Sequence, residues 1–533
     1  NCSDFAYFSF THKRTTFDVF ALMGGQTDME ALLPAFLKDF WYVFLIAIAF
    51  VVILHLFYKK LAQRYILNLE GETLTKKTVL IRSGLMIVFT GLVVIGFRGG
   101  LQLIPIGIVN AGDHVTSDKI PLVLNTPFSM IRSAELNSFE EKTYFSESEC
   151  IKLFDPCKMN KDTVAFTPLN VVVIILEGFS KEYTGISFKE KSYTPFLDSL
   201  MEEGYLFING YSNGKRSIEG IPAILSSTPS LHEPYLNTIY SNNKIQSLAT
   251  LLKKKGYNTS FYHGGTNGTM NFDSYCKMAG FERYYGRKEY NDDKDYDGTW
   301  GIWDEPFLQR YAVELGKMKQ PFLSSVFTLS SHHPFVVPEK YKQSFPEGPL
   351  PVHKSIMYSD FALKRFFESV RKEKWFTNTL FVITADHTGP SADPFYANQA
   401  GNYQIPVLFY QPGTSFKAID STVIQQTDIM PGILSYMHYD LPYFALGNDP
   451  FDKGTDHFAV NSYNNLCQFF YNNYLIEYNE STDKARWFKV GNAEWSEMVK
   501  APHDSIANVA LKKQKAFLQT YNNSLIKNGM VCE

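Results

Sequence analysis

Three polar residues follow two apolar runs of the sequence. Glu177 comes directly after residues 170–176 (NVVVIIL). Asp386 and His387 come directly after residues 379–385 (TLFVITA). Such runs are typical of strands buried on both faces of a parallel sheet, and ligands in open α/β sheets bind beyond the carboxyl ends of the strands. Two carboxylates and an imidazole at one sheet edge therefore indicate a divalent-metal site.

A hydroxyl that could act as a nucleophile lies in a polar, glycine-containing turn. Ser217 stands in SNGKRSIEG (residues 212–220), which leads into an apolar stretch typical of a helix. A serine at a helix N-terminus commonly caps the helix. The alternative is that the helix dipole and a bound cation together stabilise the alkoxide, which makes the serine a nucleophile. Lys215 and Arg216 beside it either help to hold an anionic substrate or form a solvated positive pair.

A sheet is needed to bring these residues together, and the chain from residue 168 onward has the pattern of one. Apolar runs alternate there with amphipathic stretches, which predicts a mostly parallel βαβ sheet. The expected strands are residues 171–176, 206–211, 258–262, 322–328, 380–384 and 406–410. The expected helices are residues 194–203, 247–255, 302–318 and 355–372. The predicted fold class is therefore α/β, with a catalytic domain over residues 168–440.

The last part of the chain, residues 441–533, has a different pattern. Residues 467–478 and 484–490 are rich in aromatic and apolar side chains and are separated by the polar turn NESTDK. This pattern predicts antiparallel strands. We expect a small C-terminal antiparallel sheet, in a subdomain that completes the catalytic domain.

Two N-terminal segments are long and apolar enough to cross a bilayer, which takes about 20 residues. They are residues 40–58 and 79–97, in a membrane region of residues 1–98; two buried core helices are the alternative. The connection between them carries basic residues, and short basic loops stay in the cytoplasm. These residues are Lys59, Lys60, Arg64, Lys76 and Lys77. Residues 1–38 and the chain after residue 98 are then expected outside the cytoplasm.

Residues 99–167 form the connector between the membrane region and the predicted sheet. The connector opens with an apolar, proline-containing piece (LQLIPIGIVNAG) and continues with a polar stretch. We expect it to contain amphipathic helices that lie at the membrane interface. The chain starts with Asn1 rather than Met, so we expect earlier spans or a signal to precede it in a longer protein.

Composition narrows the class of protein. A formal net charge of −3 over 533 residues leaves no basic field that could hold nucleic acid by its phosphates, so we expect no nucleic-acid partner. The aromatic content of 15% suits a membrane-associated or glycan-handling protein.

The six cysteines leave their pairing open. Cys150 and Cys157 lie close together and either close a small disulfide loop in an oxidising compartment or remain free thiols. The other four have no metal-ligand spacing; they are Cys2, Cys276, Cys467 and Cys532.

Several motifs, taken in order, resemble the lipoteichoic acid synthase branch of the alkaline phosphatase and sulfatase superfamily. They are VVVIILEGFS with Glu177, NGKRSIEGIPAILSS with Ser217, TLSSHHPF with His332, and FVITADHTG with Asp386 and His387. The later segments YQIPVLFY and QTDIMP match the same pattern. The resemblance covers about residues 170–441. It implies a sulfatase-like or alkaline phosphatase-like three-layer domain, preceded by transmembrane helices.

The resemblance also implies a cofactor, which is one divalent cation. Manganese is typical of this branch, and Mg²⁺, Zn²⁺ or Ca²⁺ are alternatives. The implied ligands are Glu177, Ser217, Asp386 and His387. Ser217 stands where the family usually has a threonine nucleophile, so a hydroxyl replaces a hydroxyl. Such a centre supports attack of the serine on the phosphorus of a phosphodiester, followed by a phospho-Ser217 intermediate that an acceptor alcohol or water resolves.

Further site residues are implied around this centre. His332 matches the family histidine that holds the phosphate or protonates the leaving group, a role that suits an imidazole. His263 occupies another family pocket position. Arg216 and Trp303 are the remaining substrate-binding candidates. The alternatives are ordinary surface or core histidines, a solvated arginine, and tryptophan packing against the sheet.

The chain departs from the family at one place. Synthases that polymerise glycerol phosphate usually carry a Trp and an Arg shortly after the histidine that matches His263. This chain has TMNFD there, with Met270 and Phe272. The Arg that would fork onto a phosphate oxygen is missing. The departure leaves the metal centre intact and puts the glycerol-phosphate substrate in question.

The expected function is that of a membrane-anchored, metal-dependent phosphotransferase. It would lie in the bacterial inner membrane as a multi-pass protein, with its catalytic domain outside the cytoplasm. It would move a phosphoglycerol-type group from a lipid donor such as phosphatidylglycerol to a glycan or lipid acceptor. Enzymatic alternatives are a phosphodiesterase, a phosphoethanolamine transferase and a sulfatase, although the sulfatase motif Cys/Ser-x-Pro/Ala-x-Arg is missing at Ser217. The non-enzymatic alternative is an inactive receptor or scaffold, which would not need all four implied ligands.

Overall fold

The structure is a computed structural model of the 533-residue chain, and two compact units make it up. The first unit is Asn1–Ser138 and the second is Phe139–Glu533. The residues that the structure describes are 41–67, 75–102, 105–115, 119–134, 139–160, 164–186, 192–463, 466–490, 495–498 and 505–532. Cys2 and the predicted outer flank of residues 1–38 lie outside this set.

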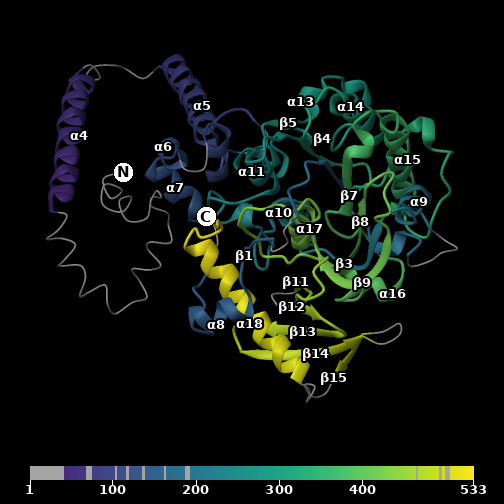
Figure 1. The fold of residues 1–533 in the computed structure, drawn as a ribbon. Coiled ribbons are helices and arrows are strands. Elements are labelled where there is room, and N and C mark those ends of the chain that lie inside the picture. Colours follow the sequence, from purple (N-terminus) through teal and green to yellow (C-terminus); the bar gives the residue numbers. More distant parts are fainter. Residues whose placement is uncertain are drawn as a thin grey trace. The chain divides into compact units, whose positions relative to one another are not determined.

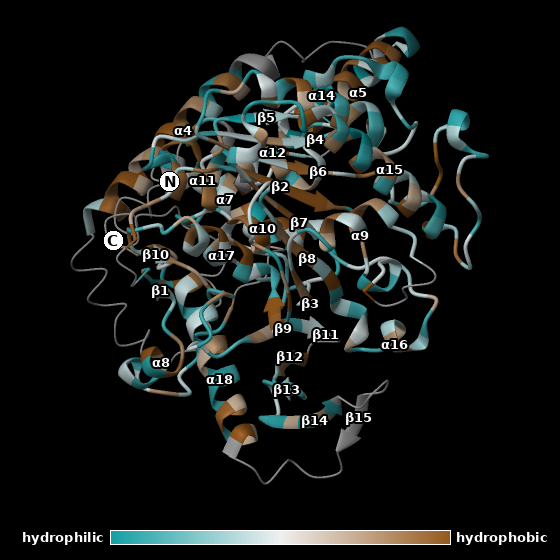
Figure 2. Cartoon of the chain, turned by 45° about the vertical axis from the view of Figure 1, so that its right-hand side comes forward, coloured by the Kyte–Doolittle hydropathy of each residue, from teal (hydrophilic) through white to brown (hydrophobic). Residues whose placement is uncertain are grey.

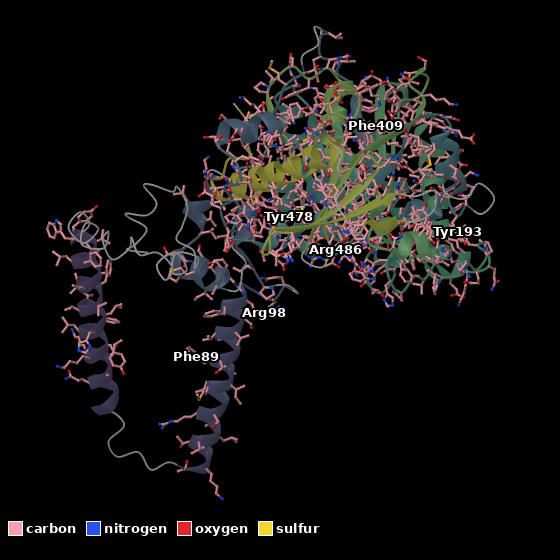
Figure 3. The ribbon with its side chains drawn as sticks, turned by 90° about the horizontal axis from the view of Figure 1, so that it is seen from below. Phe89, Arg98, Tyr193, Phe409, Tyr478 and Arg486 are labelled. Atoms are coloured by element: carbon pink, nitrogen blue, oxygen red, sulfur yellow. A yellow bond between two sulfur atoms is a disulfide. The ribbon has the colours of Figure 1, made fainter. Side chains whose placement is uncertain are left out.

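The first unit contains two long apolar helices, α4 (Trp41–Leu67) and α5 (Lys76–Arg98). Trp41–Gln63 and Lys76–Arg98 are long and apolar enough to cross a membrane by length and composition. Their side chains project outward, as Figure 3 shows for Phe89 on α5, which is 67% exposed within the structure. The shorter elements η1 (Ile108–Asp113), α6 (Ile120–Val123) and α7 (Thr126–Ser133) follow. The orientation in a membrane and the interfacial position of the connector stay predictions.

The second unit is built on an eight-stranded sheet, and the side chains of its central strands are buried. The strands are β2 (Asn170–Leu176), β3 (Tyr205–Tyr211), β4 (Asn258–His263), β5 (Arg283–Tyr285), β6 (Phe322–Phe327), β7 (Thr379–Ala385), β8 (Gln404–Tyr410) and β9 (Ala418–Gln425). Every residue of β2, β6 and β7 is buried, and these central strands are mostly hydrophobic in Figure 2. The six predicted strands are all present, with ends that differ by at most two residues; β5 and β9 were not predicted.

The strand order is β5-β4-β6-β2-β7-β8-β3-β9. The pairs of β2 with β6 and with β7 are parallel, so the carboxyl ends of the central strands meet at one edge. The strand β8 runs antiparallel to both of its neighbours, β7 and β3. The expectation of a mostly parallel sheet is therefore confirmed, with one reversed strand.

Helices cover both faces of this sheet and make a three-layer domain (Figure 1). The helices α9 (Pro195–Met201), α14 (Asp304–Gly316) and α15 (Val352–Val370) pack together on one side. The helices α10 (Ser217–Ser226), α11 (Leu248–Lys253) and α17 (Ile429–Tyr436) pack together on the other. Short helices in the connections are η3 (Lys181–Tyr183), η4 (Tyr235–Asn237), η5 (Thr269–Asn271), α12 (Phe272–Met278), α13 (Arg287–Tyr290), η6 (Asp293–Asp295), η7 (Glu339–Tyr341), η8 (Phe376–Asn378), α16 (Pro394–Ala397), η9 (Gly401–Tyr403) and η10 (Gln426–Asp428).

The predicted small antiparallel sheet is present at the C-terminal end of the chain. Its strands, in order, are β11 (Phe458–Tyr463), β12 (Leu466–Tyr471), β13 (Tyr474–Asn479), β14 (Lys484–Val490) and β15 (Trp495–Met498). The single strand expected over residues 467–478 is wrong, because the chain reverses at Asn472, whose φ of 53° is left-handed, and continues as β13. The long helix α18 (Ser505–Ile526), which was not predicted, lies against β12.

A disulfide joins Cys157 to Cys532, which lies near the C-terminus. It adjoins the two-stranded pairing of β1 (Cys157–Lys158) with β10 (Tyr443–Phe444). Both alternatives for Cys150 and Cys157 are therefore wrong, because the two cysteines do not pair with each other and Cys157 is not a free thiol. Cys150 is a buried free thiol whose Sγ lies 3.4 Å from the carbonyl oxygen of Ala516 on α18.

The stretch predicted as a connector, residues 99–167, is divided between the two units. Its later part, with the helix α8 (Glu147–Leu153), packs against α18. The side chain of Gln519 on α18 makes two hydrogen bonds with the backbone of Phe145, both of 2.9 Å. The side chain of Asn523 does the same for Lys142, at 2.9 and 2.8 Å.

Candidate active site

Glu177 lies at the carboxyl end of β2, where the buried apolar strand stops. Its backbone N–H donates to Thr328 Oγ1 at 3.0 Å, which ties it to the end of the neighbouring strand β6. Gly178 follows with a φ of 64°, a left-handed conformation that glycine adopts without steric cost. The turn keeps the Glu177 carboxylate at the sheet edge, where its side chain is 5% exposed.

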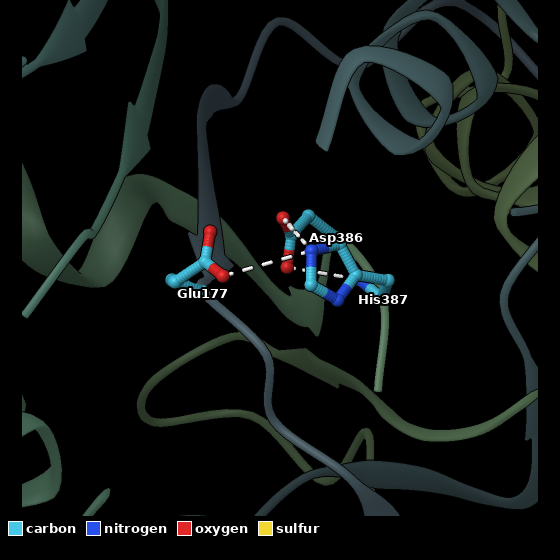
Figure 4. Close-up of side chains that lie close together, drawn as sticks. All are labelled: Glu177, Asp386 and His387. Carbon is cyan, nitrogen blue, oxygen red and sulfur yellow. Dashed lines mark hydrogen bonds and ion pairs between the residues drawn. The ribbon is translucent and has the colours of Figure 1, made fainter. Parts of the chain in front are cut away.

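Asp386 and His387 lie at the carboxyl end of β7, the strand beside β2 (Figure 4). Asp386 Oδ1 accepts hydrogen bonds from the backbone N–H groups of Gly178 and His387, both at 2.8 Å. His387 Nε2 lies 3.3 Å from Asp386 Oδ2 and 3.6 Å from Glu177 Oε1. The structure therefore brings together the three residues that the strand ends predicted.

This cluster has the donor set of a divalent cation site. One ligand atom from each of Glu177, Asp386 and His387 lies within 4.8 Å of the others. Asp386 Oδ2 is buried and has no hydrogen-bond partner, although buried polar atoms are normally paired. Burial, together with the charge of Asp386, raises the pKa of Glu177 well above its ordinary value. Two buried carboxylates and an imidazole fit a cation, which would offset that repulsion.

Ser217 is the first residue of α10 and faces this cluster. Its Oγ donates to Glu177 Oε2 at 3.3 Å, and the residue is 3% exposed. The N-cap of α10 is Arg216, whose backbone N–H donates to Glu219 Oε2 at 3.0 Å. The alternative reading of Ser217 as the helix cap is therefore wrong, and its hydroxyl is directed to the carboxylate.

The basic pair before Ser217 divides into two roles. Arg216 is half-exposed and its guanidinium pairs with Glu219 at 2.7 Å, so it does not line the cavities described below. Lys215 is partly buried, and its Nζ donates to the carbonyl and side-chain oxygens of Asn402 at 3.0 and 2.7 Å and to Thr388 Oγ1. Burial lowers the pKa of Lys215 to about 8. Lys215 thus joins the turn before Ser217 to the residue after His387.

His332 lies in the loop that follows β6 and precedes Pro334. Its Nδ1 lies 3.2 Å from the carbonyl oxygen of His333, which leaves Nε2 for other partners. The ring packs on Trp300 with centroids 3.7 Å apart, and Trp300 Nε1 donates to the same carbonyl at 2.6 Å. Burial lowers the pKa of His332. The carboxylate of Asp304 fixes the loop by accepting from the backbone N–H of Leu329 at 2.9 Å.

His263, the last residue of β4, lies in a tightly packed environment. Its ring stacks on Phe327 with centroids 4.7 Å apart, and Phe272 meets it edge-on. Burial lowers its pKa to about 4, so the imidazole is neutral near pH 7. A Cβ on Gly265 would lie 2.6 Å from His263 Nε2, so this glycine leaves room for the ring.

Two cavities meet at Glu177 and His332, which line both. The larger one measures about 460 Å³. Its polar lining includes Lys215, Ser331, His333, His387, Thr388, Ser391 and Asn402. The smaller one is lined by Ser217, His263, Thr269, Met270, Phe272, Trp300, Phe327 and Leu329, with no Lys or Arg among these described residues.

The structure places Trp303 outside the lining of both cavities. It precedes α14, and its ring meets Tyr358 edge-on with centroids 6.0 Å apart. Its neighbour Trp300 lines the smaller cavity in its place. Two lining residues, Thr388 and Asn402, were not predicted. Thr388 lies within the motif FVITADHTG and Asn402 directly precedes YQIPVLFY, and these positions are the signal that could have found them.

The sequence of this chain is similar to that of known proteins. A sequence model of the family described as Sulfatase matches residues 169–439, about half of the chain. Lipoteichoic acid synthase 1 of Bacillus subtilis is 26% identical over 312 residues, which are 54% of this chain and 48% of that protein. Lipoteichoic acid synthase of Staphylococcus saprophyticus is 28% identical over 309 residues, which are 53% and 48%. The chain spans about half the length of these curated relatives.

Solved structures share the fold. A protein in the alkaline phosphatase superfamily from Vibrio parahaemolyticus superposes with a TM-score of 0.64 at 23% identity, covering 75% of this chain and 95% of that one. The lipoteichoic acid synthase LtaP from Listeria monocytogenes superposes with a TM-score of 0.61 at 18% identity, covering 72% and 98%. The expected three-layer α/β fold and the resemblance seen in the motifs are confirmed.

Proposed function

We propose that this chain, which belongs to the sulfatase family, transfers a phosphoglycerol-type group from a membrane lipid to an acceptor of the cell envelope. The observation that carries the proposal is the Ser217 hydroxyl, 3.3 Å from Glu177 Oε2 beside the cluster of Glu177, Asp386 and His387. The names of the relatives, lipoteichoic acid synthases, support a reaction at the cell envelope.

The residues proposed to hold one divalent cation are Glu177, Ser217, Asp386 and His387. The cation we propose is Mn²⁺, with Mg²⁺, Zn²⁺ or Ca²⁺ as alternatives. When bound, it would supply a Lewis acid that offsets negative charge on the phosphoryl oxygens.

The first half of the proposed reaction forms a phospho-Ser217 intermediate. Ser217 Oγ attacks the phosphorus of the lipid phosphodiester, and Glu177, already its hydrogen-bond acceptor, takes the hydroxyl proton. The new bond is the Oγ–P bond, and the bond that breaks joins phosphorus to the diacylglycerol oxygen. His332 gives that oxygen a proton through Nε2, the ring nitrogen that does not face His333.

The second half resolves the intermediate. A hydroxyl of the glycan or lipid acceptor attacks the phosphorus, and the Oγ–P bond breaks. His332, now neutral, takes the acceptor's proton, and Glu177 returns a proton to Ser217. Burial lowers the pKa of His332, so its protonated form is a stronger acid toward the diacylglycerol oxygen and a smaller fraction of the enzyme carries that proton at the start.

A lipid donor and a site outside the cytoplasm fit two further observations. The two apolar helices α4 and α5 would keep the second unit at the bilayer surface as part of a multi-pass protein of the bacterial inner membrane. The Cys157–Cys532 disulfide belongs to a chain that folds in an oxidising compartment.

A second candidate is phosphoethanolamine transfer. The small cavity beside Ser217 is lined by Met270 and Phe272 and by no described Lys or Arg. No guanidinium among the described lining residues can therefore make paired hydrogen bonds to a second phosphate. Neither glycerol nor ethanolamine carries a further phosphate, so this lining is compatible with transfer of either headgroup.

The test uses the full chain in detergent with Mn²⁺ and vesicles of phosphatidylglycerol or of phosphatidylethanolamine. We expect metal-dependent release of diacylglycerol from the first lipid and a loss of release in Ser217→Ala, with release retained in Ser217→Thr. Release from phosphatidylethanolamine alone would favour the second candidate. Equal release by Ser217→Ala and the parent chain would refute the nucleophile assignment, and no release from either lipid would refute both functions.

A further inference from the structure

Gln426 joins the two segments that carry the cation ligands and the nucleophile. Its side-chain Nε2 donates to the backbone carbonyl oxygens of Ala385 and Asp386, at 2.8 and 2.7 Å. Its Oε1 accepts from the backbone N–H of Asn213 at 2.8 Å. Asn213 lies four residues before Ser217, in the same turn. One fully buried amide therefore touches the backbone of Asp386 and the start of the Ser217 turn.

Asn213 extends this connection into the rest of the domain. Its Oδ1 accepts from the backbone N–H of Thr427 at 3.0 Å. Its Nδ2 donates to Gln425 Oε1 at 2.8 Å and to the carbonyl oxygen of Val460 on β11 at 2.7 Å. Asn213, Gln425 and Gln426 are all buried, so water does not compete for these bonds. The turn is thus held by the segment at the end of β9 and by the C-terminal sheet.

The packing between the two segments leaves little freedom. Gly220 on the first turn of α10 is so close to Asp386 that an added Cβ would lie 2.2 Å from the Asp386 carbonyl oxygen. The same carbonyl oxygen accepts the Gln426 bond. The direction of that peptide determines where the Asp386 carboxylate lies relative to Glu177 and Ser217.

We infer that Gln426 is a positioning residue that sets the affinity of the site for its divalent cation, by holding the Asp386 peptide against the turn that delivers Ser217. The inference rests on the proposed cation centre. Groups that orient metal ligands typically change metal affinity or activity by about 10–100-fold when removed. Gln426 does not touch the ligand atoms, so its effect is exerted through Asp386 and the Ser217 turn.

The test compares Gln426→Met with Gln246→Met, each in the full chain in detergent. Gln246 is a matched control, because it is also buried and makes three hydrogen bonds with backbone groups, those of Phe444 and Cys532. Mn²⁺ alone is titrated by calorimetry, without lipid. We expect a Kd for Mn²⁺ about 10–100-fold weaker in Gln426→Met and unchanged in Gln246→Met. Both variants lose a similar amount of thermal stability.

Gln426→Glu is a second variant, in case the first does not fold. It keeps the length of the side chain and the acceptor for Asn213, and it removes the donor for both carbonyl oxygens. Mn²⁺ binding as tight as in the parent, in either folded variant, would overturn the inference. Equal weakening in Gln426→Met and Gln246→Met would also overturn it, because the cause would then be general destabilisation.

The titration separates this inference from the proposed transfer reaction. If the parent binds Mn²⁺ and only the Gln426 variants bind it weakly, the inference stands even when no lipid is turned over. If the parent binds no Mn²⁺, the cation centre is refuted and this inference with it.

Discussion

The close approach of α10 to the strand end of Asp386 predicts that Gly220→Ala damages the site. Alanine is ordinarily better than glycine inside a helix by about 1 kcal/mol. At this position, however, the added Cβ would lie 2.2 Å from the Asp386 carbonyl oxygen and 2.9 Å from its carbonyl carbon, whereas ordinary contact begins at 3.4 Å. The atoms in the way are backbone, so α10 and the Asp386 peptide must separate by roughly 1 Å.

This separation has a cost in both stability and activity. Overpacking of a dense core costs about 1–3 kcal/mol, so the expected net loss after the helix gain of about 1 kcal/mol is about 0–2 kcal/mol. Because Ser217 begins the same helix, its Oγ moves relative to Glu177, and a misplacement of about 1 Å can lower a rate by about 100-fold. The measurements are the thermal unfolding midpoint of the full chain and the metal-dependent release of diacylglycerol from phosphatidylglycerol.

Gly316→Ala is the matched control for this prediction. Gly316 ends α14, and an added Cβ there would approach nothing closer than 3.9 Å, the distance to side-chain atoms of Glu373. We expect this variant to be as stable as the parent, or more so, with unchanged release. If Gly220→Ala melts no lower than the parent and releases as much diacylglycerol, the close approach does not constrain the site and the reasoning is wrong.

Two further predictions concern stability. Removing the Cys157–Cys532 bridge by Cys157→Ser should lower the free energy of unfolding, measured with denaturant, by about 2–5 kcal/mol, because the bridge closes a loop with a sequence separation of 375. The control Cys150→Ser, at a free thiol, should leave this free energy nearly unchanged. Equal values for the two variants would contradict the pairing. Burial lowers the pKa of His263 to about 4, so between pH 4 and 6.5 this histidine binds more protons in the unfolded protein than in the folded protein. As the pH falls through that window, the free energy of unfolding of the parent should decrease by up to about 3 kcal/mol relative to that of His263→Leu. Parallel curves of stability against pH for the two proteins would refute this.

Local patterns predicted the central part of the fold because buried parallel strands are recognisable by composition alone. Residues 170–176 and 379–385 are apolar runs that no surface segment would tolerate, and both became strands of those lengths. The direction of β8 was not predictable, because a short apolar run has the same sequence pattern in a parallel strand and in an antiparallel strand. The helix α18 was missed because its apolar residues are interleaved with lysines and amides that contact distant segments.

The residues of the site fall into two groups, those that local sequence predicts and those that depend on contacts between distant segments. Glu177, Asp386 and His387 could be predicted because each follows a strand directly, and the sheet brings strand ends together whatever the loops do. Gln426 and Asn213 could not, because their contacts depend on which segments the topology places side by side. The Cys157–Cys532 pairing belongs to this second class, since spacing alone cannot select among the pairings of six cysteines.

Because the proposed reaction depends on the first group of residues and the headgroup cavity depends on loops, the sequence indicates the type of reaction more clearly than the substrate. Three of the four proposed cation ligands, Glu177, Asp386 and His387, follow strand ends, whose positions are set by backbone pairing, so changes in the loops leave them in place. The small cavity beside Ser217 is formed partly by the loop at Met270 and Asn271, whose φ values of 49° and 59° are both left-handed. Asn tolerates this conformation, whereas for Met270 it costs roughly 1–2 kcal/mol, which the surrounding packing must offset. This loop, whose Met270 lines the cavity beside Ser217, is where we expect headgroup selectivity to be set, independently of the reaction that the strand ends support.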